Sequence, residues 1–364
     1  MRSLNGNGCP AALGSGLPVR YKIASSHSGF LMNRSFGFPL LMALGIAGII
    51  LLAVYTGLQG IVRALATAGW GLLLLVPLHV FTIVLDSEGW RELLWNQGQR
   101  LSRTYLGWAA CVRGAMNTLV PISAGGVMAG IRLLWIRGVP LAEAVGNVVV
   151  EGTLSVVSEW FLVFLTLLAA LGWLHRASPS LPVVAGFLLA GAAIILGLIF
   201  WAQLNGRVFE WMTRQGLRLT TRFRSAQTPS DPQSLKKAVR EIYGRPGALV
   251  RCTFWQMLSI GAGGIEIWVI LRLMNLPGSL LFALLLQCLG RAARSFTFFM
   301  PGGIGIQEAV YALLAPVGQM SPAMGIAISL ATRFRDLLFG LPLLASWQRV
   351  ESRWIRHKRA GAAS

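Results

Sequence analysis

The sequence is poor in charge, and poorest in acidic residues. Only 12% of its 364 residues are charged, and 13 Asp and Glu stand against 32 Lys and Arg. A soluble domain carries about 25% charged residues. Hydrophobic residues make up 55% of the chain. Apolar runs such as 40–58 and 181–204 reach the roughly 20 residues that a membrane-crossing helix needs. These features exclude a soluble enzyme and predict an all-α, polytopic integral membrane protein.

The sequence also lacks the short motifs of common enzymes and metal sites. It contains no GxSxG, P-loop or HExxH motif. The segment GGIG at 302–305 is only loosely similar to a dinucleotide-binding loop, and no strand precedes it. We therefore predict no catalytic centre, no metal and no cofactor, and we do not expect an enzyme. No CxxC pair is formed by the four cysteines, which are Cys9, Cys111, Cys252 and Cys288.

The surplus of basic residues gives a net charge of +19. In a soluble protein this charge would favour nucleic-acid binding. Here the basic residues lie mostly between the apolar segments, where Lys and Arg set membrane orientation and attract anionic lipid headgroups. Membrane lipids, and not nucleic acid, are therefore the expected partners.

The apolar segments divide into six full spans and two interrupted regions. Each interrupted region, 104–138 and 278–317, contains Pro and a Gly-Gly pair. We interpret each as a re-entrant helical hairpin, because broken backbone at membrane depth is tolerated inside protein or beside a water-filled cavity. One or two complete spans per region are the alternatives. The full spans are expected at 38–58, 68–85, 142–171, 183–204, 248–273 and 322–347.

Basic residues also predict the orientation of the chain in a bacterial inner membrane. With both termini in the cytoplasm, 22 Lys and Arg fall in cytoplasmic stretches, including the polar stretch 86–103, and only Arg63, Arg176 and Arg272 lie outside. Met32, just before the first span, is an alternative start of the natural chain. The expected parts are a disordered cytoplasmic tail over 1–36, a membrane domain over 37–348 with a basic cytoplasmic loop at 205–247, and a basic cytoplasmic tail over 349–364.

The two interrupted regions are similar to each other. Residues 119–132 read LVPISAGGVMAGIR, and residues 299–308 read FMPGGIGIQE. Each segment leads from Pro and Gly-Gly into a helix, then a turn with Pro, then a span that carries charge. The orientation above would invert one unit relative to the other, and inverted repeats with broken helices recur in transporters. Chance similarity between two short motifs is the alternative.

Ionisable side chains lie inside the predicted spans, where each destabilises the fold unless it is paired or hydrated. One interpretation is a polar cavity between the repeats, in which arginines neutralise an anionic lipid headgroup and acidic residues hold the arginines. The alternative is a set of buried ion pairs, for example Glu308 with Arg333 or Arg294. On the first interpretation, Glu308→Gln should abolish transport without loss of protein. The predicted substrate-binding residues are Arg132, Glu151, Arg291, Arg294, Gly302, Gly303, Glu308, Arg333, Arg335 and Asp336.

Helical spacing restricts the arrangement of the arginines in the second interrupted region and the span after it. Arg291 and Arg294 are three residues apart and share a helix face, whereas Arg333 and Arg335 point about 200° apart. We therefore expect the first two and one of the others to form a basic pocket near the second Gly-Gly pair. Asp336 should pair with whichever arginine turns away.

Two motifs resemble those of a known family. FMPGGIGIQE at 299–308 and RFRDLLFG at 333–340 are similar to the flippase-like membrane domain of lysylphosphatidylglycerol synthases, and the resemblance covers roughly residues 40–348. It implies movement of a lipid between leaflets or export of a modified lipid. No large globular stretch follows the last span, so we do not expect synthesis of a lysyl-lipid.

Within that family, the hopanoid-biosynthesis-associated membrane protein type is the most similar. The shared pattern is Pro121, Gly125-Gly126, IRLL at 131–134 and RGVP at 137–140. Val127 stands where the hopanoid type often has an acidic residue, and Glu151-Gly152 where it tends to have an Asp-Lys type of pair. These departures leave the identity of the lipid open.

Three functions follow from these observations, and we predict the first. It is an inner-membrane translocase or transporter of a phospholipid, hopanoid or polyprenyl-linked lipid. The second is an intramembrane enzyme that uses Glu308 or Glu151 as a base, and the third is a scaffold for lipid-biosynthesis proteins. No ATP-binding motif marks the sequence, so a gradient or withdrawal of product would have to drive transport.

The orientation can be tested with single cysteines and an impermeant thiol reagent. We expect a cysteine at position 176 to be labelled in intact cells, because this position follows the third span. A cysteine at position 225, in the basic loop, should be labelled only after lysis. Labelling of intact cells at 225 but not at 176 would overturn the orientation.

Overall fold

The computed structural model describes residues 58–95, 101–119, 125–177, 232–296 and 305–360, with scattered helical positions between 183 and 201. Every regular element in these ranges is a helix, which confirms the predicted all-α class. The first predicted span, the 1–36 tail, the second Gly-Gly pair and most of the basic 205–247 loop lie outside the described residues.

The helices form two groups in chain order, which we call the first half and the second half. The first half contains α2 (Leu58–Ala68), the 3-10 helix η1 (Gly69–Leu74), α3 (Leu75–Trp95), α4 (Arg103–Leu119), α5 (Gly125–Ile136) and α6 (Leu141–Ala177). The second half contains α9 (Pro232–Tyr243), α10 (Pro246–Leu273), α11 (Leu280–Phe296), α12 (Ile306–Leu314), the 3-10 helix η3 (Ala315–Gly318) and α13 (Pro322–Ala360).

Three helical stretches of the described chain are long and apolar enough to cross a membrane. Gln59–Leu94 contains the predicted span 68–85, and Leu141–Leu171 and Pro246–Leu273 match the spans expected at 142–171 and 248–273. These stretches support a membrane-embedded protein. α13 covers the span expected at 322–347, but charged residues interrupt its apolar sequence. The count of six spans stays a prediction.

Two segments that were expected to be polar connections are helical. α3 continues through the polar stretch to Trp95, because its charged side chains find partners. Arg91 Nη2 lies 2.6 Å from Glu88 Oε2, and Arg251 Nε of α10 lies 2.8 Å from Glu92 Oε2. Arg63, expected in an outside loop, lies within α2.

Helices also form in the two basic segments that were expected on the cytoplasmic side. α9 lies within the predicted 205–247 loop, and its apolar residues Leu235, Val239 and Ile242 are buried where α9 packs against α6. The predicted 349–364 tail begins as a continuation of α13, which reaches Ala360. α9 and the continuation of α13 are polar in sequence, so hydropathy alone did not reveal them.

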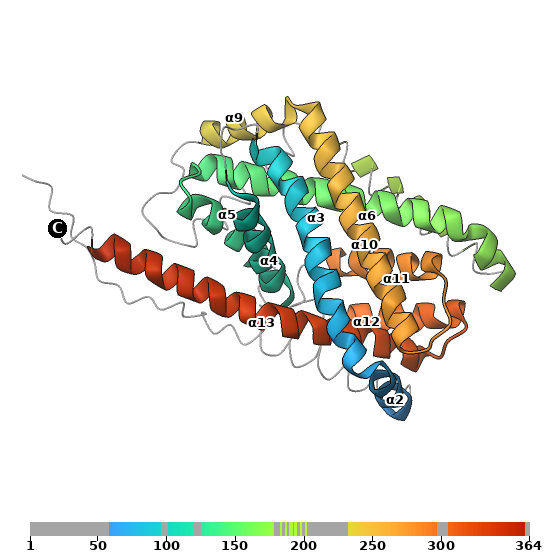
Figure 1. The fold of residues 1–364 in the computed structure, drawn as a ribbon. Helices are drawn as coiled ribbons and strands as arrows, with labels where there is room; N and C mark the ends of the chain where they lie inside the picture. Colours follow the sequence, from blue (N-terminus) through green and yellow to red (C-terminus); the bar gives the residue numbers. More distant parts are fainter. Residues whose placement is uncertain are drawn as a thin grey trace, which may run out of the picture. The chain divides into compact units, whose positions relative to one another are not determined.

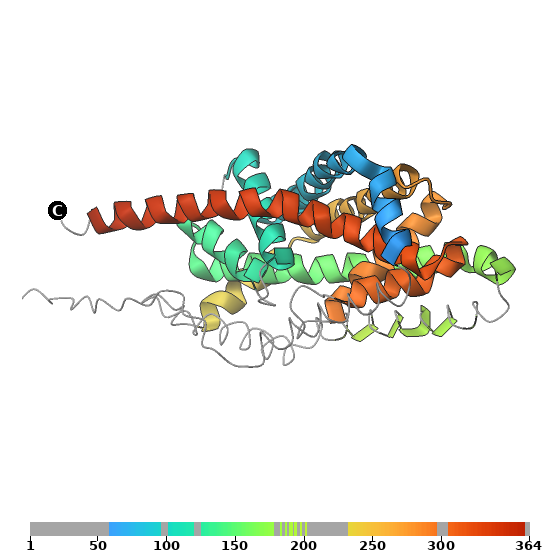
Figure 2. The same ribbon diagram turned by 90° about the horizontal axis from the view of Figure 1, so that it is seen from below.

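The two halves contact each other reciprocally. Within the halves, α4 packs against α5 and α11 against α12, so each interrupted region contains a pair of contacting helices. Between the halves, α3 packs against α10, α4 against α13, and α11 against α6. Figure 1 shows α3 and α10 running in opposite directions, and Figures 1 and 2 show the same for α6 and α13. The first helix of each interrupted region, α4 or α11, therefore packs on the last long helix of the other half.

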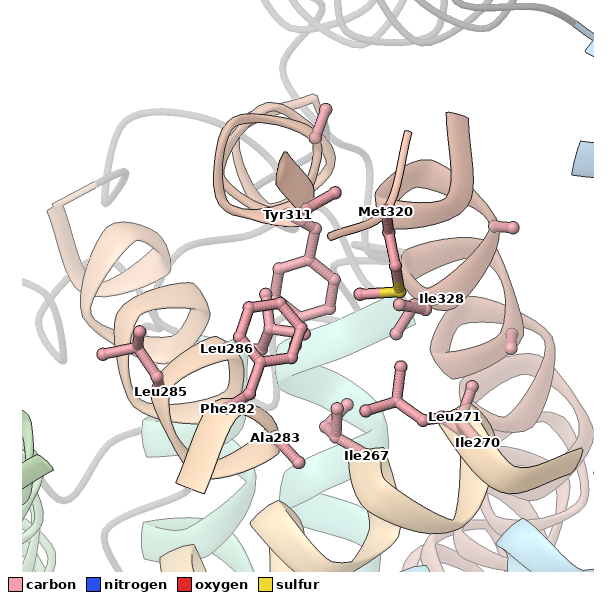
Figure 3. Close-up of a cluster of buried hydrophobic side chains, with 14 of the residues drawn as sticks. Ile267, Ile270, Leu271, Phe282, Ala283, Leu285, Leu286, Tyr311, Met320 and Ile328 are labelled. Atoms are coloured by element: carbon pink, nitrogen blue, oxygen red, sulfur yellow. The ribbon is translucent and has the colours of Figure 1, made fainter. Parts of the chain in front are cut away.

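Buried apolar side chains join the helices of the second half. Figure 3 shows Ile267 and Leu271 of α10, Phe282 of α11, Tyr311 of α12 and Met320 converging in one cluster. A separate cluster in the first half surrounds Trp90, which is fully buried. The first cluster also includes Leu75 of the first half and the second includes Leu235 of the second half, so the two halves share both apolar cores.

α12 and α13 approach each other closely at Gly325. A Cβ atom on this residue would lie 2.2 Å from the backbone oxygen of Tyr311. Small residues allow such close approach between helices in membrane proteins. The contact matters for function because α12 and α13 carry Glu308 and Arg333, which form an ion pair described below.

We expect Gly325→Ala to lower the free energy of unfolding by about 2 kcal/mol, because the added methyl group overpacks this contact. Gly261→Ala on α10 is the matched control, since a Cβ atom there meets nothing within 4 Å. Thermal unfolding in detergent should show a lower melting temperature for the first variant and an unchanged or higher one for the second. Equal melting temperatures would contradict the close approach.

Candidate functional site

Charged side chains are buried in the interior of the described helices. Six of them expose 8% or less of their surface, and burial of a charge is costly unless the charge is paired and hydrogen-bonded. Their partners therefore define the candidate site. The six residues are Glu151, Glu159, Glu266, Glu308, Arg335 and Asp336.

Four residues from three helices form what we call the His79 cluster: His79 of α3, Glu266 of α10, and Arg335 and Asp336 of α13. Arg335 donates from Nη1 to Glu266, and from Nε and Nη2 to Asp336 Oδ1 at 3.0 and 2.5 Å. His79 Nδ1 lies 3.5 Å from the second oxygen of Glu266. The imidazole also contacts Phe339 edge to face, with ring centroids 5.2 Å apart. The cluster links both halves through charged groups.

Glu308 makes the second connection in this region, between α12 and α13. Its Oε2 accepts a hydrogen bond from the Gly305 N–H at 2.8 Å, which caps the start of α12. Gly305 has φ of 92°, a conformation that glycine adopts without strain. Oε1 accepts from Arg333 Nε at 3.0 Å and from Ser329 Oγ at 3.2 Å. The sequence-based alternative of a Glu308–Arg333 pair is confirmed, as is the pairing of Asp336 with Arg335.

A third group of charges lies in the first half. Glu151 of α6 accepts from Arg113 Nη2 of α4 at 2.6 Å and from Gln256 Nε2 of α10 at 2.9 Å. Asp86 of α3 lies 3.6 Å from the same guanidinium nitrogen. The Arg113 guanidinium also stacks over the Trp90 ring, 4.9 Å from its centroid. Four helices meet at this group.

The remaining predicted arginines lie at other helix contacts. Arg132 of α5 donates to Glu351 of α13, at 2.5 Å from Nη2 and 3.1 Å from Nε. Arg291 Nε of α11 lies 3.4 Å from Glu159 Oε2 of α6. Arg294, one turn further along α11, contributes to the electrostatic field around Asp336.

Arg294 lies close enough to Arg291 and Arg333 to be affected by their charge. Arg291 also faces α6, Arg333 faces α12 and Arg335 faces α10, and each of these three has a carboxylate partner. Gly302 and Gly303 lie outside the described residues, so the basic pocket expected beside them stays a prediction. The substrate-binding role of the ten predicted residues stays a prediction.

Several of the groups that complete these pairs were not among the predicted site residues. Arg113 was missed because it lies in an interrupted apolar region, although the same signal, a lone arginine among apolar residues, had marked Arg132. Glu266 lies inside a predicted span, but no residue at helical spacing from it indicates its partner on α13. His79 of α3 approaches Glu266 of α10, a contact between helices that the sequence does not show.

A shallow depression of about 370 Å³ lies apart from these charges. It is lined by residues from the start of α4, the turn after α5 and the end of α13. Within the described ranges, no three His, Cys, Asp or Glu side chains come together as metal ligands. The buried charged groups are therefore the best candidate for function.

Removing one partner of a buried ion pair should lower the free energy of unfolding far more than removing one partner of an ion pair at the surface. We expect Arg113→Gln to lower the free energy of unfolding by about 3–5 kcal/mol, because it leaves the Glu151 carboxylate buried without its cation. Arg251→Gln breaks the more exposed pair with Glu92 and should cost about 1 kcal/mol or less. Thermal unfolding of the two variants in detergent makes the comparison, and similar losses would argue against a buried charge at Glu151.

Comparison with known families supports a lipid-related membrane function. The family model described as the lysylphosphatidylglycerol synthase TM region matches residues 40–343. A comparison with curated proteins gave no match. The matched range includes the described helices α2 to α12 and most of the apolar part of α13. The chain belongs to the lysylphosphatidylglycerol synthase TM region family.

Proposed function

We propose that the protein moves a lipid with an anionic headgroup between the two leaflets of the membrane. The observation that carries this proposal is an asymmetry within the ion pairs. Arg333 and Arg291 expose 18% and 31% of their side chains, whereas their partners Glu308 and Glu159 expose 0% and 6%. An anion approaching from outside the pair would therefore meet the guanidinium group before the carboxylate.

Arginine suits this role because its planar guanidinium binds phosphate with two parallel hydrogen bonds. Each arginine is already held in place by a buried carboxylate, so little conformational entropy of its side chain is lost when a ligand binds. A phosphate can then compete for the exposed N–H groups.

The helix contacts also fit a transporter built from two inverted units. α4 and α11 occupy equivalent positions in the two halves, and each packs on the last long helix of the other half. We propose that the halves are inverted repeats and that the paired helices α4–α5 and α11–α12 are re-entrant hairpins. In such folds, movement of one repeat against the other exposes a central site to each side of the membrane in turn.

The substrate class that fits best is a phospholipid or another phosphate-bearing lipid, including a polyprenyl-linked one. A hopanoid substrate rests on the resemblance of the 119–140 region alone. Localisation in a bacterial inner membrane, with cytoplasmic termini, is part of the same proposal. An intramembrane enzyme and a scaffold for lipid-biosynthesis proteins are the alternatives that the experiment must separate.

Purified protein in liposomes gives the direct test. A fluorescent phosphatidylglycerol is placed in both leaflets, and an impermeant quencher reports how fast the inner pool reaches the outer leaflet. We expect the protein to accelerate this exchange, and Arg333→Lys to reduce the rate about tenfold, because lysine keeps the charge but loses the bidentate geometry.

Arg251→Lys is the matched control, since Arg251 is more than half exposed and lies in a pair at the end of α3. Its exchange rate should equal that of the unchanged protein. If exchange is no faster than in empty liposomes, the protein does not transport this lipid, and a scaffold becomes the better explanation. If the lipid is chemically converted by the protein in detergent, the protein is an enzyme. Equal lipid exchange rates for Arg333→Lys and Arg251→Lys would show that Arg333 does not contact the lipid during transport.

A further inference from the structure

The His79 cluster contains a histidine, the side-chain type that proteins most often use to bind and release protons. His79 is partly accessible, with 20% of its side chain exposed, while Glu266 exposes 2%. A proton can therefore reach the imidazole more easily than the carboxylate behind it.

Glu266 shares its cation with a second carboxylate. Both Glu266 and Asp336 contact the guanidinium of Arg335. Asp336 also lies in the electrostatic field of Arg294, whereas the other charged partner of Glu266 in these contacts is His79, and only when the imidazole carries a proton. A proton on His79 therefore favours the charged form of Glu266, since a buried carboxylate without a cation is costly.

Charged groups on each neighbouring helix define the field at His79. α10 contributes Glu266, α13 contributes Arg335 and Asp336, and Arg294 of α11 acts on Asp336. Two other helices that pack on α3 carry charged residues whose partners lie outside the His79 cluster. Arg113 of α4 pairs with Asp86 and Glu151. Glu159 of α6 pairs with Arg291.

The hydrogen bonds of Arg335 divide into a fixed and an exchangeable set. Asp336 accepts from Nε and Nη2, and it is the next residue on the same helix, so it moves with Arg335. Glu266 accepts from Nη1 only, and it belongs to α10. Exchange of Glu266 for another anion at Nη1 would leave the guanidinium oriented by Asp336.

We propose that His79 and Glu266 form a proton-binding site, and that a proton bound there allows Arg335 to exchange Glu266 for the phosphate of an anionic lipid. The proposal rests on the lipid transport proposed above and adds its coupling ion. With a proton on the imidazole, Glu266 gains a second cation and can leave Arg335 without becoming an unpaired buried charge. Without that proton, Glu266 has Arg335 as its cation in the cluster and competes with the phosphate.

Proton and lipid would then bind cooperatively. Each raises the affinity for the other by the same factor, as thermodynamic linkage requires. One proton and one singly charged phosphate carry no net charge together, so the loaded site avoids moving an unbalanced charge through the membrane interior. A transporter whose sequence shows no ATP-binding motif would in this way draw on a proton gradient.

The first experiment measures binding alone, with the full chain in detergent and a fluorescent short-chain phosphatidylglycerol as the probe. We expect the affinity at pH 5.5 to exceed that at pH 7.5 by about fivefold or more, because the proton and the lipid bind cooperatively and protons are more abundant at the lower pH. Binding should also take up protons from a weakly buffered solution. Inorganic phosphate is added as a competitor, and strong competition would identify free phosphate instead of a lipid headgroup as the ligand.

His79→Gln tests the residue itself, and Phe81→Leu on the exposed face of α3 is the matched control. The first variant should bind the probe with equal affinity at both pH values and take up no proton, while the second should behave like the unchanged protein. If His79→Gln fails to fold, proton uptake by the unchanged protein still tests whether lipid binding is coupled to proton binding. Equal affinity at both pH values without proton uptake in the unchanged protein would overturn the proposal.

The second experiment imposes a pH difference across protein-containing liposomes and follows the fluorescent lipid. Lipid should accumulate in the leaflet on the alkaline side, and His79→Gln should equilibrate the leaflets without accumulation. Exchange that ignores the pH difference in the unchanged protein would overturn the proton coupling but leave lipid transport intact. Absence of exchange at every pH would instead count against the transport on which the coupling rests.

Discussion

Charge inside an apolar environment must be paired, and this constraint determines how the described helices contact one another. The interior holds carboxylates on α6, α10, α12 and α13, and each meets an arginine, which in most cases comes from a different helix. Apolar packing between helices is weakly directional in a membrane, because lipid tails are as apolar as leucine. Ion pairs and close glycine contacts therefore select which helix faces which neighbour.

The same pairs that specify the fold also make it able to change. A buried ion pair contributes little net stability, since the loss of hydration offsets most of the attraction between the charges. Exchanging one anion for another of equal charge changes that balance only slightly. A ligand phosphate can therefore replace a carboxylate where an apolar contact of the same area would resist separation.

Hydropathy and helical spacing predicted the apolar helices well and the polar ones poorly. The spans at 142–171 and 248–273 agree with the structure within a few residues, because most of their residues are apolar. α3 and α13 extend beyond their predicted ends, because charged residues such as Glu92 find partners on other helices. Spacing limited the partner of Asp336 to Arg333 or Arg335, and the structure shows the adjacent Arg335. It could not show that Arg113 of α4 meets Glu151 of α6. Contacts between distant segments depend on how the helices pack together, and the residue spacing within one helix does not show which helix lies next to it.

α13 is a single helix that forms ion pairs with two other helices, at two positions far apart along its length. Arg335 contacts α10, and Glu351, sixteen residues later, contacts Arg132 of α5, so the two contacts lie about 24 Å apart along the axis. The helix continues through Pro342 between the two positions, and a continuous rigid helix transmits an axial shift over its whole length. A displacement of a few ångströms would break both contacts in the same step, so α13 should switch between two discrete positions and not slide through a continuum.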